Sequence, residues 1–308
     1  MSEGPPPEIG ALLDERARAR AERDWQRADE LRDTIRERGW EVVDSAAGST
    51  ARPLLAGAST AAGYADDADL ASILDQPAGI ACSLVMVADD HPADLARLLD
   101  ALERHPQDVE HELLVVANAA ASELPPLEER TTVLTLRERV GWADAVNLGL
   151  RRSRGEIVVL LDTSLEPSGA FLLPLLAAFD DPGVGLAGPW GVTSADGRQF
   201  EDAQPGEVDA IEGYCLALRR PALREVGGFD HRFRFYRNAD LDLSFAVRAK
   251  GWKAIRTEPL PLTRHEHRGW TAHDGAERDR LSRRNFYRFL RHWGDRRDLL
   301  LRWVPQRR

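Results

Sequence analysis

Residues 213–252 have the sequence GYCLALRRPALREVGGFDHRFRFYRNADLDLSFAVRAKGW. Within this stretch Gly227 and Gly228 indicate a sharp turn, because glycine adopts backbone conformations that other residues avoid. Two carboxylates, Asp240 and Asp242, follow at the start of an amphipathic segment. A carboxylate in such a position can take a proton from a hydroxyl group, or it can cap the helix that follows.

The chain before this stretch alternates apolar strands with helical segments. Apolar runs of strand length occur at 80–87, 112–117, 133–136 and 157–161, and helical spacing occurs at 95–102 and 143–153. Continuous apolar strands separated by helices are typical of a largely parallel sheet that is covered on both faces. We therefore expect one α/β domain over residues 80–270. Ligands bind such sheets at the carboxyl ends of the strands, where Asp162 follows the run 157–161.

Two motifs resemble those of family 2 glycosyltransferases. The run 141–162, GWADAVNLGLRRSRGEIVVLLD, is similar to the family pattern GxAxAxNxGxxxAxGexvxxLDxD, and the run 227–242 is similar to GGFDxxF…EDxDLxxR. The resemblance covers most of residues 80–270. It implies the GT-A nucleotide-diphospho-sugar transferase fold, in which a mostly parallel mixed sheet lies between helices. It also implies an enzyme that moves a sugar from a nucleotide-sugar donor to an acceptor hydroxyl with inversion, with cell-surface glycan synthesis as one setting.

The resemblance also implies roles for individual residues. Asp240 matches the family's general base, and Ala239 stands where the family has a neighbouring Glu. The positions implied to contact the donor are Asp162, Ser164, Asn147 and Asn118. Arg220, which follows the apolar run 213–218, is a further candidate for the donor diphosphate, with pairing to nearby acids as the alternative. The positions implied to contact the acceptor are Asp242, Tyr236 and Gly213, with helix capping as the alternative role for Asp242.

Members of this family hold a divalent metal on the donor diphosphate with a DxD motif, and the metal offsets the charge of the leaving diphosphate. This chain has a degenerate motif, because Ser164 replaces the second aspartate and a hydroxyl is a weak ligand for Mg²⁺ or Mn²⁺. A second acid is missing at Ala117, at the end of the run 112–117. We expect the metal to be held by Asp162, His265 and His267, with a polar surface loop as the alternative role of the two histidines.

Residues 1–52 have a different character. Helical spacing of apolar residues occurs at 9–17 and 25–35, and Gly39 supplies a helix end. The sequence LLDERARARAERDWQRADELRDTIRERGWEVVDSAAGS, residues 12–49, resembles the C-terminal helical module of cysteinyl-tRNA synthetases. We expect a small α-helical hairpin that serves packing or dimerisation, with tRNA binding as the alternative. Its alternating charges favour the first role, since phosphate binding needs an excess of basic residues.

Charge is distributed unevenly along the chain. The formal net charge is −10, yet residues 278–308 contain eleven arginines and three aspartates, a charge of +8 that leaves −18 for the remainder. We expect a basic helical tail over 271–308, which either is a solvated helix face or contacts anionic lipid headgroups or substrate phosphates. Residues 53–79 are rich in Ala, Gly, Ser and Asp and are expected to be a linker.

The sequence predicts a cytoplasmic protein, with peripheral contact at the inner face of the membrane as a further option. No apolar segment follows basic residues at the N-terminus, and the longest apolar run, 170–179, contains Pro174. Cys82 and Cys215 are isolated, which argues against a zinc site and a disulfide framework.

Three functions are consistent with these patterns. The first is a glycosyltransferase with a nucleotide-sugar donor and a glycan or lipid-linked acceptor. The second is a catalytically degenerate relative that serves as a binding or scaffold protein, which the two missing donor-side acids favour. The third is an RNA-associated protein that uses the N-terminal hairpin, although the acidic balance outside the tail makes nucleic acid an unfavourable partner.

Overall fold

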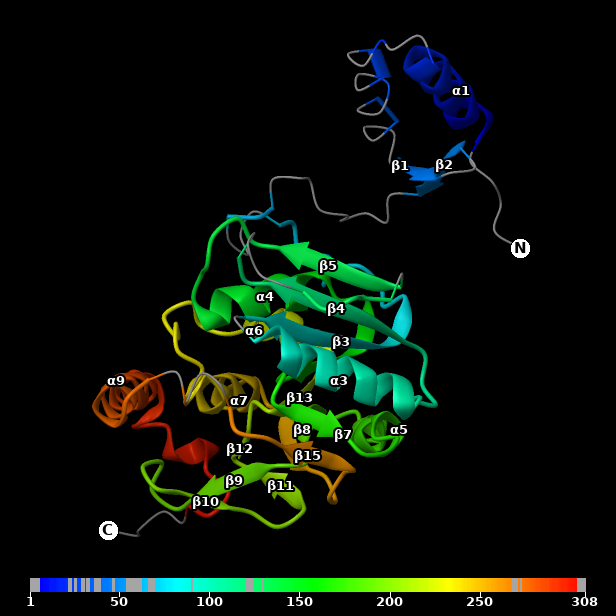
Figure 1. Cartoon of the computed structure of the whole chain (residues 1–308). Coiled ribbons are helices and arrows are strands. Elements are labelled where there is room, and N and C mark those ends of the chain that lie inside the picture. Colours follow the sequence, from blue (N-terminus) through cyan, green and yellow to red (C-terminus); the bar gives the residue numbers. More distant parts are fainter. Residues whose placement is uncertain are drawn as a thin grey trace. The chain divides into compact units, whose positions relative to one another are not determined.

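The computed structural model describes residues 6–21, 24, 27–28, 31, 34–35, 40–45, 48–53, 63–65, 70–89, 91–119, 124–128, 130–267, 271 and 273–303. The chain divides into two compact units, Met1–Ala58 and Ser59–Arg308, whose elements are shown in Figure 1. No helix among the described residues is both long enough and apolar enough to cross a bilayer.

The first unit contains the helix α1 (Pro7–Ala21) and two antiparallel strands, β1 (Trp40–Ser45) and β2 (Gly48–Pro53). A small core is formed by four buried side chains: Ile9, Leu13, Ile35 and Val42. The sequence does not predict β2, which extends from the expected hairpin into the expected linker. Its pairing with β1 supplies the backbone hydrogen bonds that the sequence pattern alone does not reveal.

The first helix of the expected N-terminal hairpin is therefore present. Of the expected second helix, residues 27–28, 31 and 34–35 are helical, and the intervening residues lie outside the described part of the chain. The expected helix end at Gly39 lies outside it as well.

The second unit is built on a mixed sheet (Figure 1). Its strands are β3 (Ile80–Ala88), β4 (His111–Ala117), β5 (Thr131–Thr135), β6 (Gly155–Leu161), β8 (Val184–Gly188), β11 (Gly206–Val208), β13 (Cys215–Arg219) and β14 (Lys253–Arg256). The strand order is β11-β14-β8-β13-β6-β3-β4-β5. The strands β3, β4, β5 and β6 run parallel, whereas β13 runs antiparallel to β6 and β8. The four predicted strands before residue 162 are thus confirmed.

Helices cover both faces of this sheet, as expected for strands that are apolar throughout. The helices α3 (Pro92–Arg104) and α5 (Leu172–Leu176) pack on one face, and α4 (Trp142–Arg152), α6 (Arg220–Val226) and α7 (Ala239–Ala249) pack on the other (Figure 1). Successive residues of β3 alternate between the two faces: Leu84 and Met86 pack with α3, whereas Val85 packs with α4. The unit therefore has one core on each side of the sheet.

Smaller elements extend the unit beside the carboxyl end of β6. The strand β7 (Leu165–Pro167) pairs with β15 (Leu262–Arg264), and β9 (Gly191–Ser194) pairs with β10 (Phe200–Asp202) and β12 (Ala210–Ile211). Two 3₁₀ helices, η2 (Ala177–Asp180) and η3 (Arg297–Leu299), follow α5 and the last long helix.

Part of the expected linker belongs to the α/β unit. Tyr64 N donates a hydrogen bond to Thr135 O at 2.8 Å, so Tyr64 extends the edge of the sheet beside β5. Leu70 and Leu74 are buried in the core that contains α4. The linker prediction does not hold for these residues, because their burial ties them to the sheet, and residues 54–62 and 66–69 lie outside the described part.

The basic C-terminal segment forms α9 (Gly275–Trp293), which packs against α7 (Figure 1). The carboxylate of Asp274 caps this helix by accepting a hydrogen bond from Glu277 N at 2.9 Å. The apolar residues of α9 pack on the unit's own core, where Phe289 is buried against Phe245 of α7. The segment is therefore a packed part of the α/β unit and not a detached tail.

Replacing Phe289 with alanine is expected to destabilise the second unit by about 3–5 kcal/mol, the usual cost of removing a buried phenylalanine. Phe289 is 1% exposed. Tyr287 is 65% exposed on the same helix, and its replacement with alanine should change stability by less than about 0.5 kcal/mol. Denaturant unfolding of the full chain measures both variants. Equal effects would contradict the packing of α9.

Candidate active site

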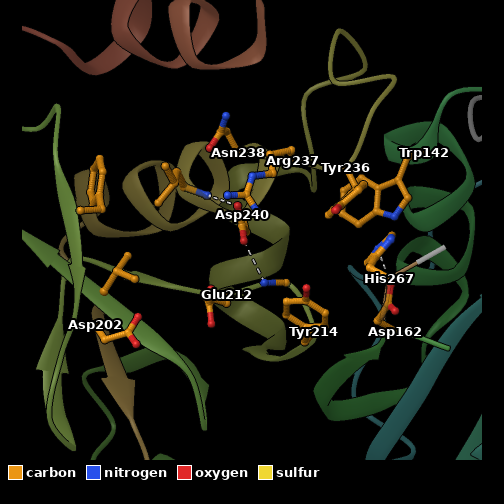
Figure 2. A pocket seen from close by; sticks show the side chains of 14 residues that line it. Trp142, Asp162, Asp202, Glu212, Tyr214, Tyr236, Arg237, Asn238, Asp240 and His267 are labelled. Atoms are coloured by element: carbon orange, nitrogen blue, oxygen red, sulfur yellow. Dashed lines mark hydrogen bonds and ion pairs between the residues drawn. The ribbon is translucent and has the colours of Figure 1, made fainter. Parts of the chain in front are cut away.

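Two adjoining cavities open where the carboxyl end of β6 meets the start of α7. The first, which we call the Asp240 cavity, has a volume of about 230 Å³, and the second, the Asn118 cavity, has a volume of about 440 Å³. Five residues line both cavities: Trp142, Asp162, Gly213, Tyr236 and His267. Figure 2 shows the Asp240 cavity with its lining side chains. Cavities that share a wall can hold two molecules against each other.

Asp162 follows the last residue of β6 and lies where the cavities meet. Its Oδ1 accepts hydrogen bonds from Ser164 N at 2.9 Å and from Ser164 Oγ at 2.5 Å, and its Oδ2 lies 3.0 Å from His267 Nε2. Loss of contact with water would raise the pKa of Asp162, but the bonds from His267 and Ser164 hold it below its ordinary value. Ser164 is buried and lines neither cavity, so it orients Asp162 instead of contacting a donor directly.

Tyr236 and His267 form part of the shared wall (Figure 2). Their rings are stacked, with centroids 3.7 Å apart and planes 8° from parallel. The ring of Tyr214 meets His267 edge-on at a centroid distance of 6.0 Å. Burial raises the pKa of Tyr236, so its phenol keeps its proton near neutral pH. These contacts fix the plane of the imidazole whose Nε2 faces Asp162.

Asp240 lies in the first turn of α7 and points into its cavity (Figure 2). Its Oδ2 accepts a hydrogen bond from Gly213 N, and its Oδ1 accepts one from Leu241 N, both at 2.9 Å. Asn238 turns the chain into the helix with a left-handed backbone conformation, φ 64°. Burial raises the pKa of Asp240, and burial followed by the charge of Asp240 raises the pKa of Glu212. A carboxylate with a raised pKa is a stronger base.

The donor set beside β6 fits a divalent cation. Asp162 and His267 present a carboxylate oxygen and an imidazole nitrogen 3.0 Å apart, a combination that suits Mn²⁺ and that leaves further positions for phosphate oxygens. His265 is not brought to this place, because its Nε2 bonds to Glu166 Oε2 at 2.8 Å beside the β7–β15 pair. The strand β15 ends at Arg264, so His265 and His267 lie beyond it and do not share one face of a strand.

Asn147 lines neither cavity. Its Oδ1 accepts a hydrogen bond from Phe229 N at 2.8 Å, and its Nδ2 donates to Phe229 O at 2.8 Å. Gly228 has a φ of 102°, and a Cβ atom at this position would lie 2.4 Å from Asn147 Oδ1. The expected donor contact of Asn147 is therefore not supported. Instead, the two motifs that carried the family resemblance bond to each other.

Two further expected contacts are replaced by packing. Arg220 is buried where β6 begins, and its guanidinium donates to Gln76 O at 3.1 Å and to Ser153 O at 2.7 Å, away from the donor side. Asp242 is buried on the far side of α7, because two helical residues turn by about 200°. Its Oδ1 accepts a hydrogen bond from Trp293 Nε1 at 2.8 Å.

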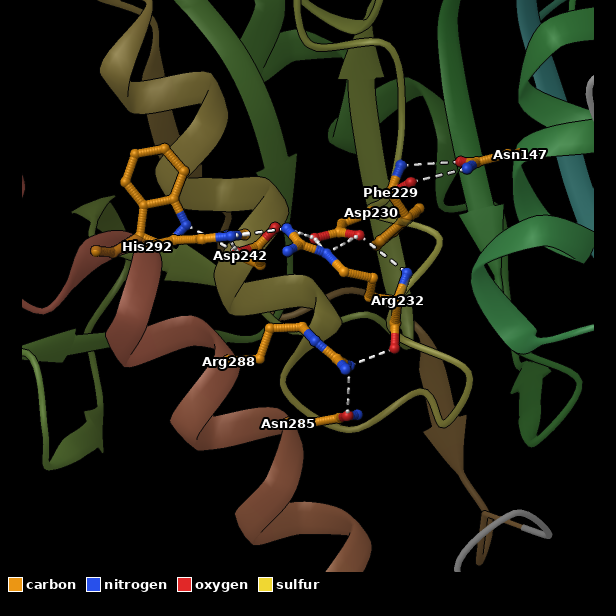
Figure 3. Close-up of polar contacts among 9 residues, drawn as sticks. Asn147, Phe229, Asp230, Arg232, Asp242, Asn285, Arg288 and His292 are labelled. Carbon is orange, nitrogen blue, oxygen red and sulfur yellow. Dashed lines mark hydrogen bonds and ion pairs between the residues drawn. The ribbon is translucent and has the colours of Figure 1, made fainter.

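Figure 3 shows that Asp242 belongs to a charged cluster between α7 and α9. Arg232 bonds to Asp230 Oδ2 with its guanidinium and lies 2.7 Å from His292 Nε2, and His292 Nδ1 lies 3.3 Å from Asp242 Oδ1. The oxygen and nitrogen atoms of Asp230, Asp242 and His292 come within 4.8 Å of one another. The guanidinium of Arg232 already supplies the positive charge that a metal ion would bring to these carboxylates. We therefore interpret the cluster as a contact that joins α9 to the loop before α7.

Asn118 lines the second cavity, but its side chain is engaged. Its Nδ2 donates to Asp89 Oδ1 at 3.0 Å, and its Oδ1 accepts from Val140 N at 3.1 Å. Asp89 also lines this cavity, although it was not among the predicted site residues. It follows the end of β3, which is the same signal that identified Asp162 after β6.

Several other lining residues were not among the predicted contacts, because loops and a distant strand bring them together. They are Trp142, Asp202, Glu212, Tyr214, Arg237 and His273.

The variant Asp240→Asn is expected to be at least as stable as the wild-type protein at pH 7, since it removes a charge whose burial is unfavourable. The folded-state pKa of Asp240 is raised, so this cost is present above that pKa and disappears as pH falls toward the ordinary carboxyl value of about 4. Melting temperatures of the two proteins should therefore converge on acidification. A difference that is constant with pH contradicts the burial of this charge.

Comparison with known proteins places both parts of the chain. Residues 83–259 match the model for glycosyl transferase family 2, and residues 2–50 match the model for the cysteinyl-tRNA ligase anticodon binding domain. A pre-mycofactocin glycosyltransferase of Mycobacterium tuberculosis is 28% identical over 165 residues, which cover 48% of this chain and 33% of that protein. Cysteine–tRNA ligase 1 of Burkholderia lata is 46% identical over 54 residues, which cover 18% of this chain and 12% of the ligase.

The fold has a counterpart among solved structures. GalNAc-T7, solved with UDP, GalNAc and Mn²⁺, superimposes with a TM-score of 0.56 at 15% identity over 71% of this chain and 49% of its own. The chain spans about a third of the length of the glycosyltransferase relative and an eighth of the ligase. The superposition confirms the GT-A fold, and the family 2 model covers more than half of the chain. The chain belongs to glycosyl transferase family 2.

Proposed function

We propose that this chain transfers a sugar from a nucleotide-sugar donor to an acceptor hydroxyl, with inversion at the anomeric carbon. The observation that carries the proposal is the pair of cavities that meet at Asp162 and Tyr236. Asp240 lines the first of these cavities and not the second. The Asn118 cavity lies at the carboxyl ends of parallel strands, where α/β sheets bind nucleotides. The donor binds there, and the acceptor binds in the Asp240 cavity.

On the donor side, Asp162 and His267 would hold Mn²⁺ or Mg²⁺, and the ion supplies positive charge that offsets the leaving diphosphate. The hydrogen bonds from Ser164 keep the Asp162 carboxylate charged and oriented. The stack with Tyr236 keeps the imidazole of His267 beside it. The structurally similar GalNAc-T7 was solved with UDP and Mn²⁺, which supports a metal-dependent donor site.

On the acceptor side, Asp240 takes the proton of the acceptor hydroxyl. The acceptor oxygen forms a bond to the anomeric carbon as the bond from that carbon to the diphosphate breaks, and the nucleoside diphosphate leaves. Attack from the face opposite the diphosphate inverts the anomeric centre. Hydrogen bonds from Gly213 N and Leu241 N hold the carboxylate in the cavity, and its raised pKa suits a general base.

A catalytically degenerate binding or scaffold protein is the alternative. Ser164 and Ala117 stand where the family pattern has acids, which favours this alternative. The convergence of Asp162, His267 and Asp240 on two joined cavities favours the transferase.

The variant Asp240→Asn is expected to lose about 100- to 10,000-fold of the transfer rate, the usual contribution of a positioned general base. The matched control is Asp242→Asn, which should lower the rate far less, because the Asp242 side chain faces α9 and not the cavities. Release of nucleoside diphosphate from a panel of UDP-, GDP- and dTDP-sugars, with and without Mn²⁺, measures both. A wild-type chain that binds a donor but releases no product supports the binding-protein alternative.

We also propose that the protein acts in the cytoplasm at the inner face of a membrane, which it contacts through α9. The exposed residues Arg280, Arg284, Tyr287 and Arg291 follow one another at intervals of four, three and four residues and so share one helix face. The apolar side of α9 packs on the core, which leaves this basic face outward. Each arginine near an anionic bilayer contributes about 1 kcal/mol of attraction.

The double variant Arg284→Glu with Arg291→Glu should abolish sedimentation with vesicles that contain phosphatidylserine, and added salt should do the same to the wild-type protein. The same charge change at Arg104 and Arg130, which lie exposed elsewhere on the unit, should leave sedimentation intact. Equal losses for the two double variants would show that net charge, and not the α9 face, governs binding.

A further inference from the structure

The Asp240 cavity is unusually acidic for a site that would accept a phosphorylated molecule. Asp202 at the end of β10, Glu212 in the turn before β13 and Asp240 at the start of α7 all line it, and Figure 2 shows their carboxylates around one space. Asp162 adds a fourth carboxylate at the shared wall. These acids come from four separate elements, so their convergence is a property of the fold and not of one acidic segment.

Positive charge in this cavity is sparse. Arg237 is the one arginine or lysine among the described residues that line it. Arg264 is not among the lining residues, but its guanidinium bonds to Glu212 Oε2 at 3.0 Å and lies over the Tyr214 ring at 5.0 Å from its centroid. This contact orients Glu212 and Tyr214 while leaving the cavity with more acids than bases.

The rest of the lining is aromatic and apolar. Trp142, Phe200, Tyr214 and Tyr236 contribute rings. The volume of about 230 Å³ is below the usual range for drug-sized ligands, so the cavity suits a single ring. Sugars combine apolar C–H faces, which pack on aromatic rings, with hydroxyl groups, which donate hydrogen bonds to carboxylates. Phosphate and carboxylate groups of a ligand carry negative charge, so the carboxylates that line the cavity would repel them.

We propose that the acceptor unit bound beside Asp240 is an uncharged sugar ring whose hydroxyls are held by Asp202 and Glu212. A sugar that carries phosphate on the ring being bound is then a poor ligand. This inference rests on the proposed transferase function and favours a glycan over a lipid-linked acceptor whose bound sugar ring carries phosphate. Asp202 and Glu212 thereby determine specificity, whereas Asp240 remains the base.

The test compares methyl glycosides of glucose, galactose, mannose and N-acetylglucosamine with the corresponding sugar 1-phosphates. Binding to the full chain without donor is measured by ligand-observed NMR titration. We expect at least one methyl glycoside to bind ten times more tightly than its 1-phosphate. Tighter or equal binding of the 1-phosphates, or binding of neither class, overturns the proposal.

The variant Asp202→Asn with Glu212→Gln should weaken binding of the methyl glycoside and reduce its advantage over the 1-phosphate at least tenfold. Glu201→Gln is the matched control, because Glu201 neighbours Asp202 on β10 but does not line the cavity. A double variant that keeps the wild-type preference contradicts the roles of Asp202 and Glu212. Melting temperatures check that each variant is folded.

This experiment and the transfer assay fail separately. Selective binding of an uncharged glycoside by a chain that transfers no sugar would keep this recognition and reject the transferase. Transfer to a sugar phosphate would keep the transferase and reject the uncharged acceptor.

Discussion

The two hydrogen bonds between the Asn147 side chain and the Phe229 backbone join the parts of the α/β unit on which the candidate site is built. Asn147 lies in α4, and Phe229 follows it by 82 residues in the turn before α7. Both groups are buried, so losing the amide would leave backbone groups unpaired at a cost of about 1–3 kcal/mol each. Gly228 is required beside this contact, because a side chain there would collide with Asn147.

The loop that starts at Phe229 is held from the other side by α9. The buried Asn285 donates hydrogen bonds to Phe235 O at 2.7 Å and to Arg237 O at 2.9 Å, the two carbonyls that flank Tyr236. Hydrogen bonds from Asn147 on one side and Asn285 on the other hold the loop that contains Tyr236, which explains how this loop can form the wall between two cavities. It also explains why the basic C-terminal segment is integral to this unit, since its inner face carries Asn285 and its outer face carries the arginines.

Other carboxylates lie near the two positions, Ser164 and Ala117, where the family pattern has acids. Beside Ser164, which replaces an aspartate, Asp162 gains His267 as a partner at 3.0 Å. Near Ala117, the neighbouring strand β3 is followed by Asp89, which bonds to Asn118 in the same cavity. Both substitutions therefore leave a carboxylate in the Asn118 cavity. This arrangement supports an altered donor site over a lost one.

Local pattern was sufficient for the first strands and helices of the α/β unit. Apolar runs of strand length and helical spacing predicted β3, β4, β5 and β6 with α3 and α4, because the period of burial is set by backbone geometry. The glycine turn followed by an amphipathic segment predicted that Asp240 lies at the start of a helix. The second helix of the N-terminal hairpin falls mostly outside the described residues. The strand β2 was not predicted, because its sequence has no strand pattern and only its pairing with β1 identifies it.

The direction of each side chain depended on contacts between distant segments. Asn147 and Asp242 belong to recognisable motifs and Arg220 follows a strand, yet all three satisfy buried backbone or indole groups and do not face the cavities. Asp202 and Glu212 have no motif, yet they face Asp240 across a cavity built from β10, a turn and α7. A sequence pattern specifies which face of an element is apolar. Which polar groups meet is set by the packing of elements, because buried donors and acceptors must find partners wherever the chain brings them.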